Sequence, residues 1–418
     1  MSSFSIQTFG CRVNQAEAFW WTDALQKKGL KLEQDSLQSD FVVINSCTLT
    51  SRADSDTRSF IRKVSRLNPG AKLIVTGCYV ERAPEELQKM PQVWRVFSNA
   101  EKKNITAEIL SFARPQDEIS PSAFRSRALV KVQDGCDFRC TFCVIPSVRG
   151  QSVSVSKGEI VARVKELSAQ GFKEIVLTGI HLSSYGVDLK PRSSLLELLR
   201  EISNMEELSR IRLSSLDPRF LKPSLIEFIT TCEKICPHFH LSLQSGSDEI
   251  LNRMGRRSKV EAYNKILSSF RERSPHASLG ADIIVGFPGE TEEEFEQTST
   301  FLKQSPLTYF HVFSYSARPG TAAASWQQVH GRVKKERAAL LRGLSRKKNE
   351  DFRRNFLGKE CEAVMVKKGE REDEVLTSNY LRVYIPSSPC SEKEEVKVLI
   401  TQVDERMTRG EFVDRLHS

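Results

Sequence analysis

The segment LVKVQDGCDFRCTFCVIP, residues 129–146, decides how this chain of 418 residues is interpreted. An apolar, β-branched run is followed there by three closely spaced cysteines, Cys136, Cys140 and Cys143. Thiolates are soft ligands that select iron–sulfur clusters, zinc or copper(I), and a four-iron cluster normally takes four of them. Because no fourth ligand is visible nearby, the spacing favours a four-iron cluster with one iron open to a non-protein ligand. The alternatives are a zinc knuckle, or three unrelated cysteines that act as small buried hydrophobes.

The order Cys-x3-Cys-x-Phe-Cys, with Phe142 directly before Cys143, resembles the radical S-adenosylmethionine superfamily. In that superfamily the open iron binds the amino and carboxylate groups of S-adenosylmethionine. One electron from the cluster then cleaves the sulfonium and releases a 5′-deoxyadenosyl radical. The resemblance therefore implies a [4Fe-4S] cluster held by Cys136, Cys140 and Cys143, with S-adenosylmethionine as the second cofactor.

The composition is that of a globular protein with 39% hydrophobic residues. No apolar run approaches the roughly 18 residues that a membrane span needs, so no membrane association is expected. The N-terminus, Met-Ser-Ser-Phe-Ser-Ile, has no export signal. Ten cysteines in such a chain favour metal binding or catalysis over disulfides. These features predict a cytoplasmic location.

The net charge of +9 is localised. Residues 332–354 carry ten Lys or Arg and three Asp or Glu, whereas residues 357–418 carry ten basic and thirteen acidic residues. A basic segment of this density favours a polyanionic partner such as RNA, bound through its phosphates. The alternative is a solvated helix face.

Residues 1–113 alternate strand and helix patterns, which predicts an α/β domain with a parallel sheet. The predicted strands are residues 4–9, 41–45 and 72–76, and the predicted helices are residues 15–29 and 53–67. Cys11, Cys47 and Cys78 each follow the end of one of these strands. In an open parallel sheet the carboxyl ends of the strands are the edge where ligands bind, so the three cysteines are predicted to meet there. They are candidates for a second open cluster, and the alternative is ordinary burial at strand ends.

The segments around these cysteines resemble the N-terminal domain of the methylthiotransferase family. The matching stretches are Gly10-Cys11-Arg-Val-Asn14-Gln15, Asn45-Ser-Cys47-Thr48 and Thr76-Gly-Cys78. In that family the three cysteines hold an auxiliary [4Fe-4S] cluster. The resemblance also makes Asn14 a polar neighbour of the cluster, although a turn or cap role is equally open.

Residues 114–128 contain two prolines and no apolar period, which predicts a linker. From residue 129 to about 320 the alternation of strands and helices returns, and we take 129–356 as one domain. The predicted strands are 129–133, 174–178, 210–214, 239–243, 280–285 and 309–315. The predicted helices are 157–170, 193–203, 223–235, 248–272 and 291–303, with capping boxes at Ser156 and Thr291. Six strands are too few for a closed eightfold barrel and fit the partial (β/α)6 barrel that the resemblance implies.

Chemistry in such barrels lies at the carboxyl ends of the strands. The candidates for binding S-adenosylmethionine are therefore polar residues and a glycine at or near the carboxyl ends of these strands: Thr178, Gly179, Ser214, Gln244, Asp282 and Arg318. Thr178-Gly-Ile-His181 and the stretch from Ser314 to Thr321 also match the family. A structural role is expected for His181, and for Cys232 and Cys236, which are predicted to lie one turn apart on a helix.

Residues 326–356 are predicted to form a basic helical connector. Residues 357–418 contain short alternating strands between turns, which predicts a small β-barrel. This region resembles the TRAM domain of the same family, which is like an oligonucleotide-binding barrel. Because this region has more acidic than basic residues, contact with RNA is expected from the connector and from a few exposed basic side chains such as that of Arg382.

In the methylthiotransferase family, sulfur at the auxiliary cluster is methylated and delivered to a carbon from which the adenosyl radical has removed hydrogen. Such a C–H bond is not acidic enough for a general base to remove its proton, so the cofactors carry the chemistry. Branches of the family modify N6-threonylcarbamoyladenosine in tRNA, N6-isopentenyladenosine in tRNA, or an aspartate of a ribosomal protein. Residues 10–17 look most like the first branch, which implies methylthiolation at carbon two of an adenine in the anticodon loop.

The expected partners are therefore tRNA, a reductant and a sulfur donor, and DNA is not expected. The other two branches remain alternatives. A hypothesis from another class is an RNA-binding iron–sulfur sensor without turnover.

Overall fold

The computed structural model describes residues 2–114 and 126–416, which form two compact units. The described residues of the first unit are 2–114, 134–153 and 316–324, and those of the second are 126–133, 154–315 and 325–416. Most of the predicted linker, residues 115–125, lies outside the described residues. The segment that carries Cys136, Cys140 and Cys143 therefore belongs to the same unit as the N-terminal domain.

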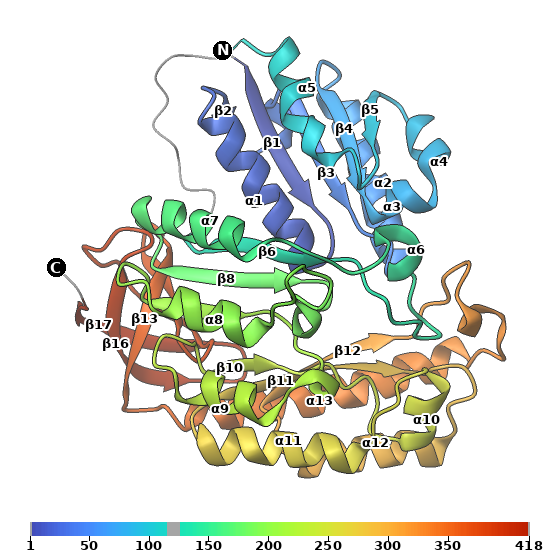
Figure 1. The fold of residues 1–418 in the computed structure, drawn as a ribbon, viewed down its shortest axis with the longest axis vertical. Coiled ribbons are helices and arrows are strands. Elements are labelled where there is room, and N and C mark those ends of the chain that lie inside the picture. Colours follow the sequence, from blue (N-terminus) through green and yellow to red (C-terminus); the bar gives the residue numbers. More distant parts are fainter. Residues whose placement is uncertain (1, 115–125, 417–418) are drawn as a thin grey trace. The chain divides into compact units, whose positions relative to one another are not determined.

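The first unit is built on a parallel sheet of five strands (Figure 1). In sheet order the strands are β2 (Lys31–Leu32), β1 (Ser3–Thr8), β3 (Phe41–Ser46), β4 (Lys72–Gly77) and β5 (Val93–Phe97). The strands β3 and β4 are buried along almost their whole length, which explains their continuous apolar runs.

Helices cover both faces of this sheet. They are α1 (Arg12–Gln26), α2 (Ser51–Leu67), α3 (Cys78–Arg82), α4 (Pro84–Gln88) and α5 (Ile105–Phe112). One apolar cluster joins the sheet to α1 and α5 through Trp21 and Ile105, and the other joins it to α2 and α3 through Ile61 and Tyr79. The predicted α/β domain is confirmed. The prediction did not include the strands β2 and β5 or the helices α3, α4 and α5; β5 is a partly buried edge strand with no clear alternation.

The second unit contains six parallel strands with helices between them (Figure 1). The strands are β6 (Ala128–Asp134), β8 (Glu174–Gly179), β9 (Arg210–Leu213), β10 (His238–His240), β11 (Ser278–Val285) and β12 (Tyr309–Ser314), with the short β7 (Val153–Ser154) beside β6. Isolated parallel bridges, Ile211 to Ile235 and Leu216 to Leu241, join the sheet that ends at β9 to the sheet that begins at β10. This is the partial barrel that the sequence predicts.

The helices between these strands follow the prediction with two exceptions. They are α7 (Lys157–Ala169), α8 (Leu195–Ser203), α9 (Pro223–Thr231), α10 (Asp248–Arg253), α11 (Val260–Arg273) and α12 (Glu292–Gln304). Both predicted capping boxes are present, at Ser156 with Glu159 and at Thr291 with Glu294. The prediction of one helix over residues 248–272 is wrong. Gly255 has a φ of +73°, a left-handed conformation that ends α10 before α11 begins.

The prediction that Cys232 and Cys236 share a helix is also wrong, because α9 ends at Thr231. Cys236 is nevertheless buried, as expected for a structural cysteine. Short 3-10 helices complete the two units: η1 (Ser36–Gln38), η2 (Lys102–Asn104), η3 (Leu182–Ser184), η4 (Pro218–Phe220) and η5 (Ala322–Ser325).

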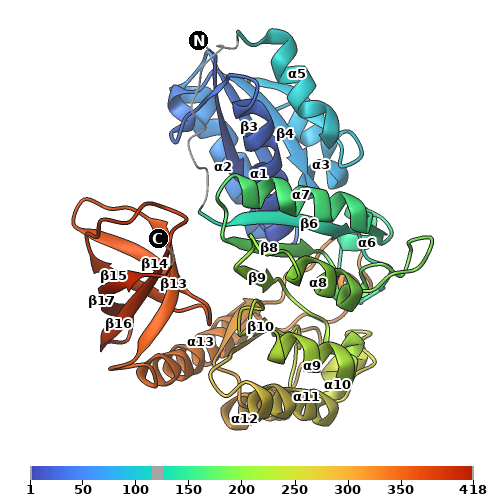
Figure 2. The ribbon, with the colours of Figure 1, turned by 60° about the vertical axis from the view of Figure 1, so that its left-hand side comes forward.

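The predicted connector is the helix α13 (Gly331–Arg354), and it leads into a closed five-stranded barrel (Figure 2). The barrel strands are β13 (Glu360–Lys367), β14 (Glu372–Thr377), β15 (Arg382–Pro386), β16 (Glu395–Val403) and β17 (Thr408–Arg415). Phe352 and Phe356 join the apolar core of this barrel. The Arg353 guanidinium donates to the carbonyls of Asp404, Glu405 and Met407. The end of α13 is thus part of the barrel's packing.

A buried ion pair links the small barrel to the strands of the large one. Glu174 and Arg212 are fully buried, and the Arg212 Nε lies 2.7 Å from a Glu174 carboxylate oxygen. Arg212 also donates to the carbonyls of Thr377 and Ser378 in the small barrel, at 3.2 and 3.0 Å. Burial alone raises the pKa of Glu174, but the charges of Arg212, Arg127 and Arg210 overcome it and lower that pKa to about 2.

We expect the substitution Glu174→Gln to lower the free energy of unfolding by about 3 kcal/mol, because it leaves the buried Arg212 cation without its partner. Since the pKa of Glu174 falls from an ordinary 4.5 to about 2, its contribution is complete above pH 4.5 and is lost as the pH falls toward 2. Urea unfolding of the wild type and the variant between pH 7 and pH 3 measures both effects. Glu261→Gln, at an exposed helix pair with Lys265, is the matched control and should change little. Equal stability of the Glu174 variant and the control would contradict this prediction.

Candidate functional site

The first unit brings Cys11, Cys47 and Cys78 together at one edge of its sheet. Cys11 follows β1 and caps α1, Cys47 follows β3, and Cys78 follows β4 as the first residue of α3. Because β1, β3 and β4 are neighbours in the sheet, their carboxyl ends lie side by side. Burial raises the pKa of the Cys47 thiol to about 12, and the negative charges of Cys11 and Cys78 add to the effect. This three-cysteine group is called the first triad below.

Glycines precede two of these cysteines because the turns have no room for a side chain. Gly10 and Gly77 both have a positive φ, at +105° and +102°. A Cβ added at Gly10 would lie 2.7 Å from the Cys47 Sγ, and one added at Gly77 would lie 2.3 Å from the Ser46 carbonyl oxygen. The two turns therefore require glycine for their backbone conformation and for the close approach of the neighbouring strand end.

Asn14 is a buried polar neighbour of the first triad. Its amide nitrogen donates to the carbonyls of Phe9 and Ser46 at 3.0 and 2.9 Å, and the Cys11 thiol lies 3.4 Å from its Oδ1. These contacts hold the ends of β1 and β3 in place and also set Asn14 beside Cys11, so both roles left open by the sequence stay predictions.

Arg149 connects the first triad to the segment that carries the other three cysteines. It ends the short helix α6 (Ile145–Arg149), six residues after Cys143, and its side chain is 1% exposed. Its Nε donates to the Cys78 Sγ at 3.2 Å, and its terminal nitrogens donate to Asn14 at 2.5 Å, Glu17 at 3.1 Å and Asp134 at 2.9 Å.

The environment of Arg149 keeps it charged. Burial opposes its protonation, but the charges of Glu17, Cys78 and Asp134 raise the pKa of Arg149 well above its ordinary value. Sequence reasoning missed Arg149, Glu17 and Lys102, whose ammonium also binds Glu17 at 2.7 Å. The only signal was an Arg-Gly pair shortly after the cysteine motif.

Cys136, Cys140 and Cys143 lie in a tight loop after β6 and are called the second triad. Each is partly buried. The loop is closed by the bonds from the Cys136 N–H to the Gly150 carbonyl at 3.1 Å and from the Cys143 N–H to the Cys140 carbonyl at 3.0 Å. Gly135 has a φ of +68°, and a Cβ there would lie 1.9 Å from the Gln151 carbonyl oxygen. Glycine is therefore required where the strand turns into the loop.

The chemistry of the two triads fits iron–sulfur clusters. Both are thiol-only sets of three, and no disulfide joins any of the ten cysteines, all of which lie in the described residues. Within residues 2–114 and 126–416, no three His, Cys, Asp or Glu side chains converge as a site for a lone metal ion requires. Beside the first triad, the Asn45 Oδ1 and the Thr76 Oγ1 are buried without a hydrogen-bond partner.

Two of the predicted cofactor residues present buried hydroxyls at the ends of neighbouring strands. Thr178, near the end of β8, is 0% exposed, and Ser214, directly after β9, is 5% exposed. Neither hydroxyl has a hydrogen-bond partner in the structure. A buried polar group without a partner is costly, and the role of both hydroxyls toward a ligand stays a prediction. At Gly179, an added Cβ would lie 2.9 Å from the Gln133 Oε1.

Gln244, four residues after β10, lies beside Asp282 of β11. Gln244 has a φ of +85°, and its N–H donates to the Asp282 carbonyl at 2.8 Å. The Asp282 carboxylate lies 3.1 Å from the His240 Nε2. Burial opposes ionisation, but the hydrogen bond from His240 and the charges of His240 and His311 lower the pKa of Asp282, which lies within β11.

Arg318 belongs to the first unit, unlike the other predicted cofactor residues. Its guanidinium donates to Asp54 at 2.5 Å, Thr48 at 2.8 Å and Ser51 at 3.1 Å. These contacts place it beside the residues that follow Cys47. Its role toward S-adenosylmethionine stays a prediction.

His181 is partly buried in a polar network. Its N–H donates to the Gln133 Oε1 at 2.7 Å and its Nε2 lies 3.3 Å from Asp217. Asp217 also pairs with Arg219 at 2.6 Å and Arg256 at 3.2 Å. This network at the end of β9 was not predicted from the sequence.

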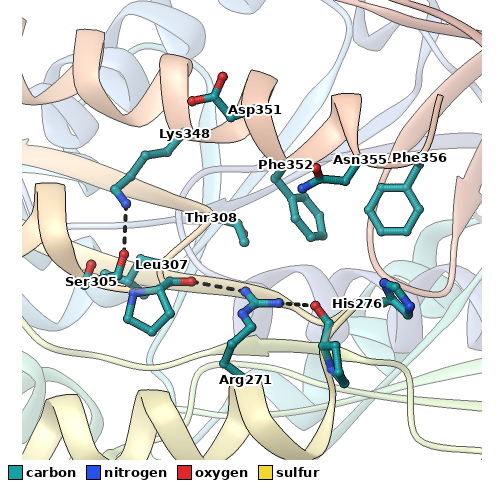
Figure 3. A pocket seen from close by; sticks show the side chains of 12 residues that line it. Arg271, His276, Ser305, Leu307, Thr308, Lys348, Asp351, Phe352, Asn355 and Phe356 are labelled. Atoms are coloured by element: carbon teal, nitrogen blue, oxygen red, sulfur yellow. Dashed lines mark hydrogen bonds between the residues drawn. The ribbon is translucent and has the colours of Figure 1, made fainter.

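A pocket of about 350 Å³ lies between the end of α11, residues 305–308 and the end of α13 (Figure 3). Figure 3 shows that its two central cations point at backbone carbonyls: Lys348 donates to Ser305 at 2.9 Å, and Arg271 donates to Pro275 and Pro306. None of the predicted site residues lines it. Lys348 fastens α13 to residue 305, and Arg271 fastens the end of α11 to the loops at residues 275 and 306.

The partial barrel, the second triad after its first strand and the sheet with the first triad define a radical S-adenosylmethionine enzyme. Residues 130–302 match the family model described as the radical SAM superfamily, and residues 3–98 match uncharacterized protein family UPF0004. The chain belongs to the radical S-adenosylmethionine methylthiotransferase family.

Two curated relatives and one solved structure illustrate the similarity. The threonylcarbamoyladenosine tRNA methylthiotransferase MtaB of Aquifex aeolicus is 38% identical over 91% of this chain and 95% of its own length. The tRNA-2-methylthio-N(6)-dimethylallyladenosine synthase of Desulfitobacterium hafniense is 31% identical over 96% of each chain. The radical S-adenosylmethionine methyltransferase TsrM from Kitasatospora setae matches with a TM-score of 0.56 and 16% identity, over 78% of this chain and 77% of that one. This last likeness concerns the fold alone.

No helix in the described part of the chain has the length and apolar character that a membrane crossing requires.

We expect Arg149→Ala to destabilise the first unit by about 3 kcal/mol, because it leaves Glu17 and Asp134 without a buried cation that both contact. Arg149→Lys should recover only part of the lost stability, since a lysine ammonium cannot reproduce the several N–H donors of the planar guanidinium. Urea unfolding of the protein without clusters measures the loss. Arg52→Ala removes an arginine whose side chain is 90% exposed and is the matched control. An Arg149→Ala variant as stable as that control would contradict the anchoring role.

Proposed function

We propose that this protein transfers a methylthio group to carbon two of N6-threonylcarbamoyladenosine, beside the anticodon of tRNA. The observation that carries the proposal is the pair of cysteine triads within one compact unit, joined by the buried Arg149. We infer the substrate from the name of the threonylcarbamoyladenosine relative, which is 38% identical to this chain over most of its length. The dimethylallyladenosine relative is 31% identical.

Each triad would hold one cluster. Cys136, Cys140 and Cys143 would ligate the radical-generating [4Fe-4S] cluster, and Cys11, Cys47 and Cys78 the auxiliary one. When bound, the clusters and S-adenosylmethionine supply the electron, the radical and the sulfur transfer that an unreactive C–H bond requires. A reductant must supply the electron and a sulfur donor must supply the sulfur, so both are proposed partners. A cytoplasmic location, where thiols stay reduced, suits both triads.

The strand ends of the second unit supply groups for S-adenosylmethionine. The hydroxyls of Thr178 and Ser214 are buried donors that suit its carboxylate. Asp282 is held ionised by His240 and suits its ammonium or a ribose hydroxyl. Gln244 holds the backbone of Asp282 in place, and Gly179 allows close approach at the end of β8. We propose that these residues orient the cofactor and exclude water from it.

The helix α13 is the proposed contact for the RNA backbone. Of its ten basic residues, six are exposed: Arg332, Lys335, Arg342, Arg346, Lys347 and Arg354. Arg337 and Arg353 are buried, with Arg337 bound to Glu290 at 2.6 Å and Arg353 bound to carbonyls of the small barrel. The positive face available for phosphates is therefore smaller than the sequence suggests, and it lies along the solvent side of the helix.

The direct test is the nucleoside content of tRNA. A strain that has N6-threonylcarbamoyladenosine but cannot methylthiolate it should gain the 2-methylthio derivative when this protein is expressed, as detected by mass spectrometry of digested tRNA. Expression of the protein with Cys136 and Cys140 changed to alanine is the matched control and should give no product. Methylthiolation of N6-isopentenyladenosine in place of the threonylcarbamoyl base would move the protein to the other tRNA branch.

Iron and sulfide counts test the two clusters. In anaerobically reconstituted protein, replacing Cys11, Cys47 and Cys78 by alanine should halve both counts and leave reductive cleavage of S-adenosylmethionine to 5′-deoxyadenosine intact. Replacing Cys136, Cys140 and Cys143 should also halve the counts but abolish cleavage. Replacing Cys232 and Cys236 is the matched control and should leave iron and sulfide unchanged. A wild type that cannot cleave S-adenosylmethionine would favour the RNA-binding sensor.

A further inference from the structure

The strand β12 is the edge of the partial barrel and has two different faces. It pairs only with β11 in its sheet, whose order is β10-β11-β12. Phe310 and Val312, on one face, are 3% and 8% exposed. On the other face, where successive side chains alternate, His311 is exposed and Phe313 is 45% exposed. A large aromatic ring is thus left accessible near the carboxyl end of a barrel strand.

The open face of β12 is the inner face of the barrel. The rings of His311 and His240 are 5.4 Å apart, and His240 binds Asp282, a proposed cofactor residue. A Cβ added at Gly280 would collide with the ring of Tyr309, which stands on the same face of β12. Going along β11, the inner side chains become more exposed toward the carboxyl end, where Asp282 and Ile284 are only partly buried. Phe313 therefore faces the open end of the lumen where the chemistry of such barrels occurs.

The helix α13 places a cation at the same level of the strand. The Ser345 hydroxyl bonds both the N–H and the carbonyl of Phe310, each at 2.8 Å, so α13 covers the free edge of β12. One turn before Ser345, the Arg342 guanidinium donates to the Val312 carbonyl at 3.2 Å. Val312 directly precedes Phe313, so the guanidinium is bound to the free edge of the strand one residue before the exposed ring. Arg342 is exposed, and its remaining N–H donors can bind a phosphate.

An aromatic ring with an arginine beside it matches a nucleotide of single-stranded RNA. Unpaired bases stack on aromatic side chains, and the phosphate next to the base takes a bidentate arginine. The basic face of α13 continues past Arg342 through Arg346 and Lys347, which suits a chain of phosphates rather than one isolated anion.

We propose that Phe313 and Arg342 form a nucleotide-binding element at the edge of the barrel, with the ring of Phe313 stacked on the base that enters the lumen and Arg342 on its phosphate. This inference rests on the proposed function and deepens it, because it names residues that hold the substrate. Phe313 then positions the target adenine, and His311 extends the same platform.

A fluorescent RNA tests the stacking directly. The probe is an anticodon stem-loop with 2-aminopurine in place of the target adenine, whose fluorescence falls when the base stacks on an aromatic ring. Reconstituted wild-type protein should quench it. Phe313→Ala should abolish the quenching and weaken binding about ten-fold, whereas Phe313→Trp should restore both. Phe112→Ala, at an aromatic residue of the first unit that is 52% exposed, is the matched control and should behave like the wild type.

The salt dependence of binding tests Arg342. Arg342→Gln should lower the slope of log Kd against log salt by about 0.7, the value for one phosphate of a single strand. Lys265→Gln, at a surface lysine of α11 that is 75% exposed, is the matched control and should leave the slope unchanged.

Three results would overturn the inference. One is equal quenching by the wild type and Phe313→Ala. Another is RNA binding by the wild type without quenching. The third is a Phe313→Ala variant that loses affinity for S-adenosylmethionine and keeps its affinity for RNA, because the ring would then stack on the cofactor's adenine. If the wild type methylthiolates tRNA in the nucleoside test, any of these results overturns only this inference and leaves the proposed function standing.

Discussion

The buried guanidinium of Arg149 is the interaction on which the arrangement of the first unit depends. A charge with 1% exposure must be paired, and Arg149 satisfies it with the carboxylates of Glu17 and Asp134, the amide oxygen of Asn14 and the Cys78 sulfur. Glu17 and Asn14 come from α1, Cys78 begins α3, and Asp134 ends β6. One side chain thus holds the loop of the second triad against the strand ends that carry the first.

Parallel strands explain why the chemistry gathers where it does. Each crossover returns the chain to the same edge of the sheet, so residues that follow successive strands become neighbours. In the first unit this brings together Cys11, Cys47 and Cys78. In the second unit it places Thr178 and Ser214 at the ends of β8 and β9, and Asp282 lies within the carboxyl half of β11. Glycines at the turns, such as Gly77 and Gly135, allow the close approach of backbone that both arrangements need.

The basic connector shows how tertiary structure redistributes charge. Arg337 pairs with Glu290, Arg353 donates to carbonyls of the small barrel, and Lys348 donates to the Ser305 carbonyl. What remains on the solvent side includes Arg342, which also fastens α13 to the edge of β12. The same helix therefore closes a strand edge, enters the core of the small barrel and carries the cations proposed for RNA.

By itself the sequence determined the fold class, the six parallel strands of the barrel, the five short strands of the small one, both capping boxes and the two sets of three cysteines. These are carried by local signals: apolar runs, capping residues and the spacing of cysteines. It did not reveal the break at Gly255, the edge strand β5, or the end of α9 before Cys232, because a left-handed turn and a half-exposed edge leave weak patterns. Only the tertiary structure decided that Arg149 binds Cys78, that Arg318 lies beside Asp54, and that Phe313 stays exposed on the inner face of β12. Each of these depends on contacts between segments far apart in the chain, which no local pattern encodes.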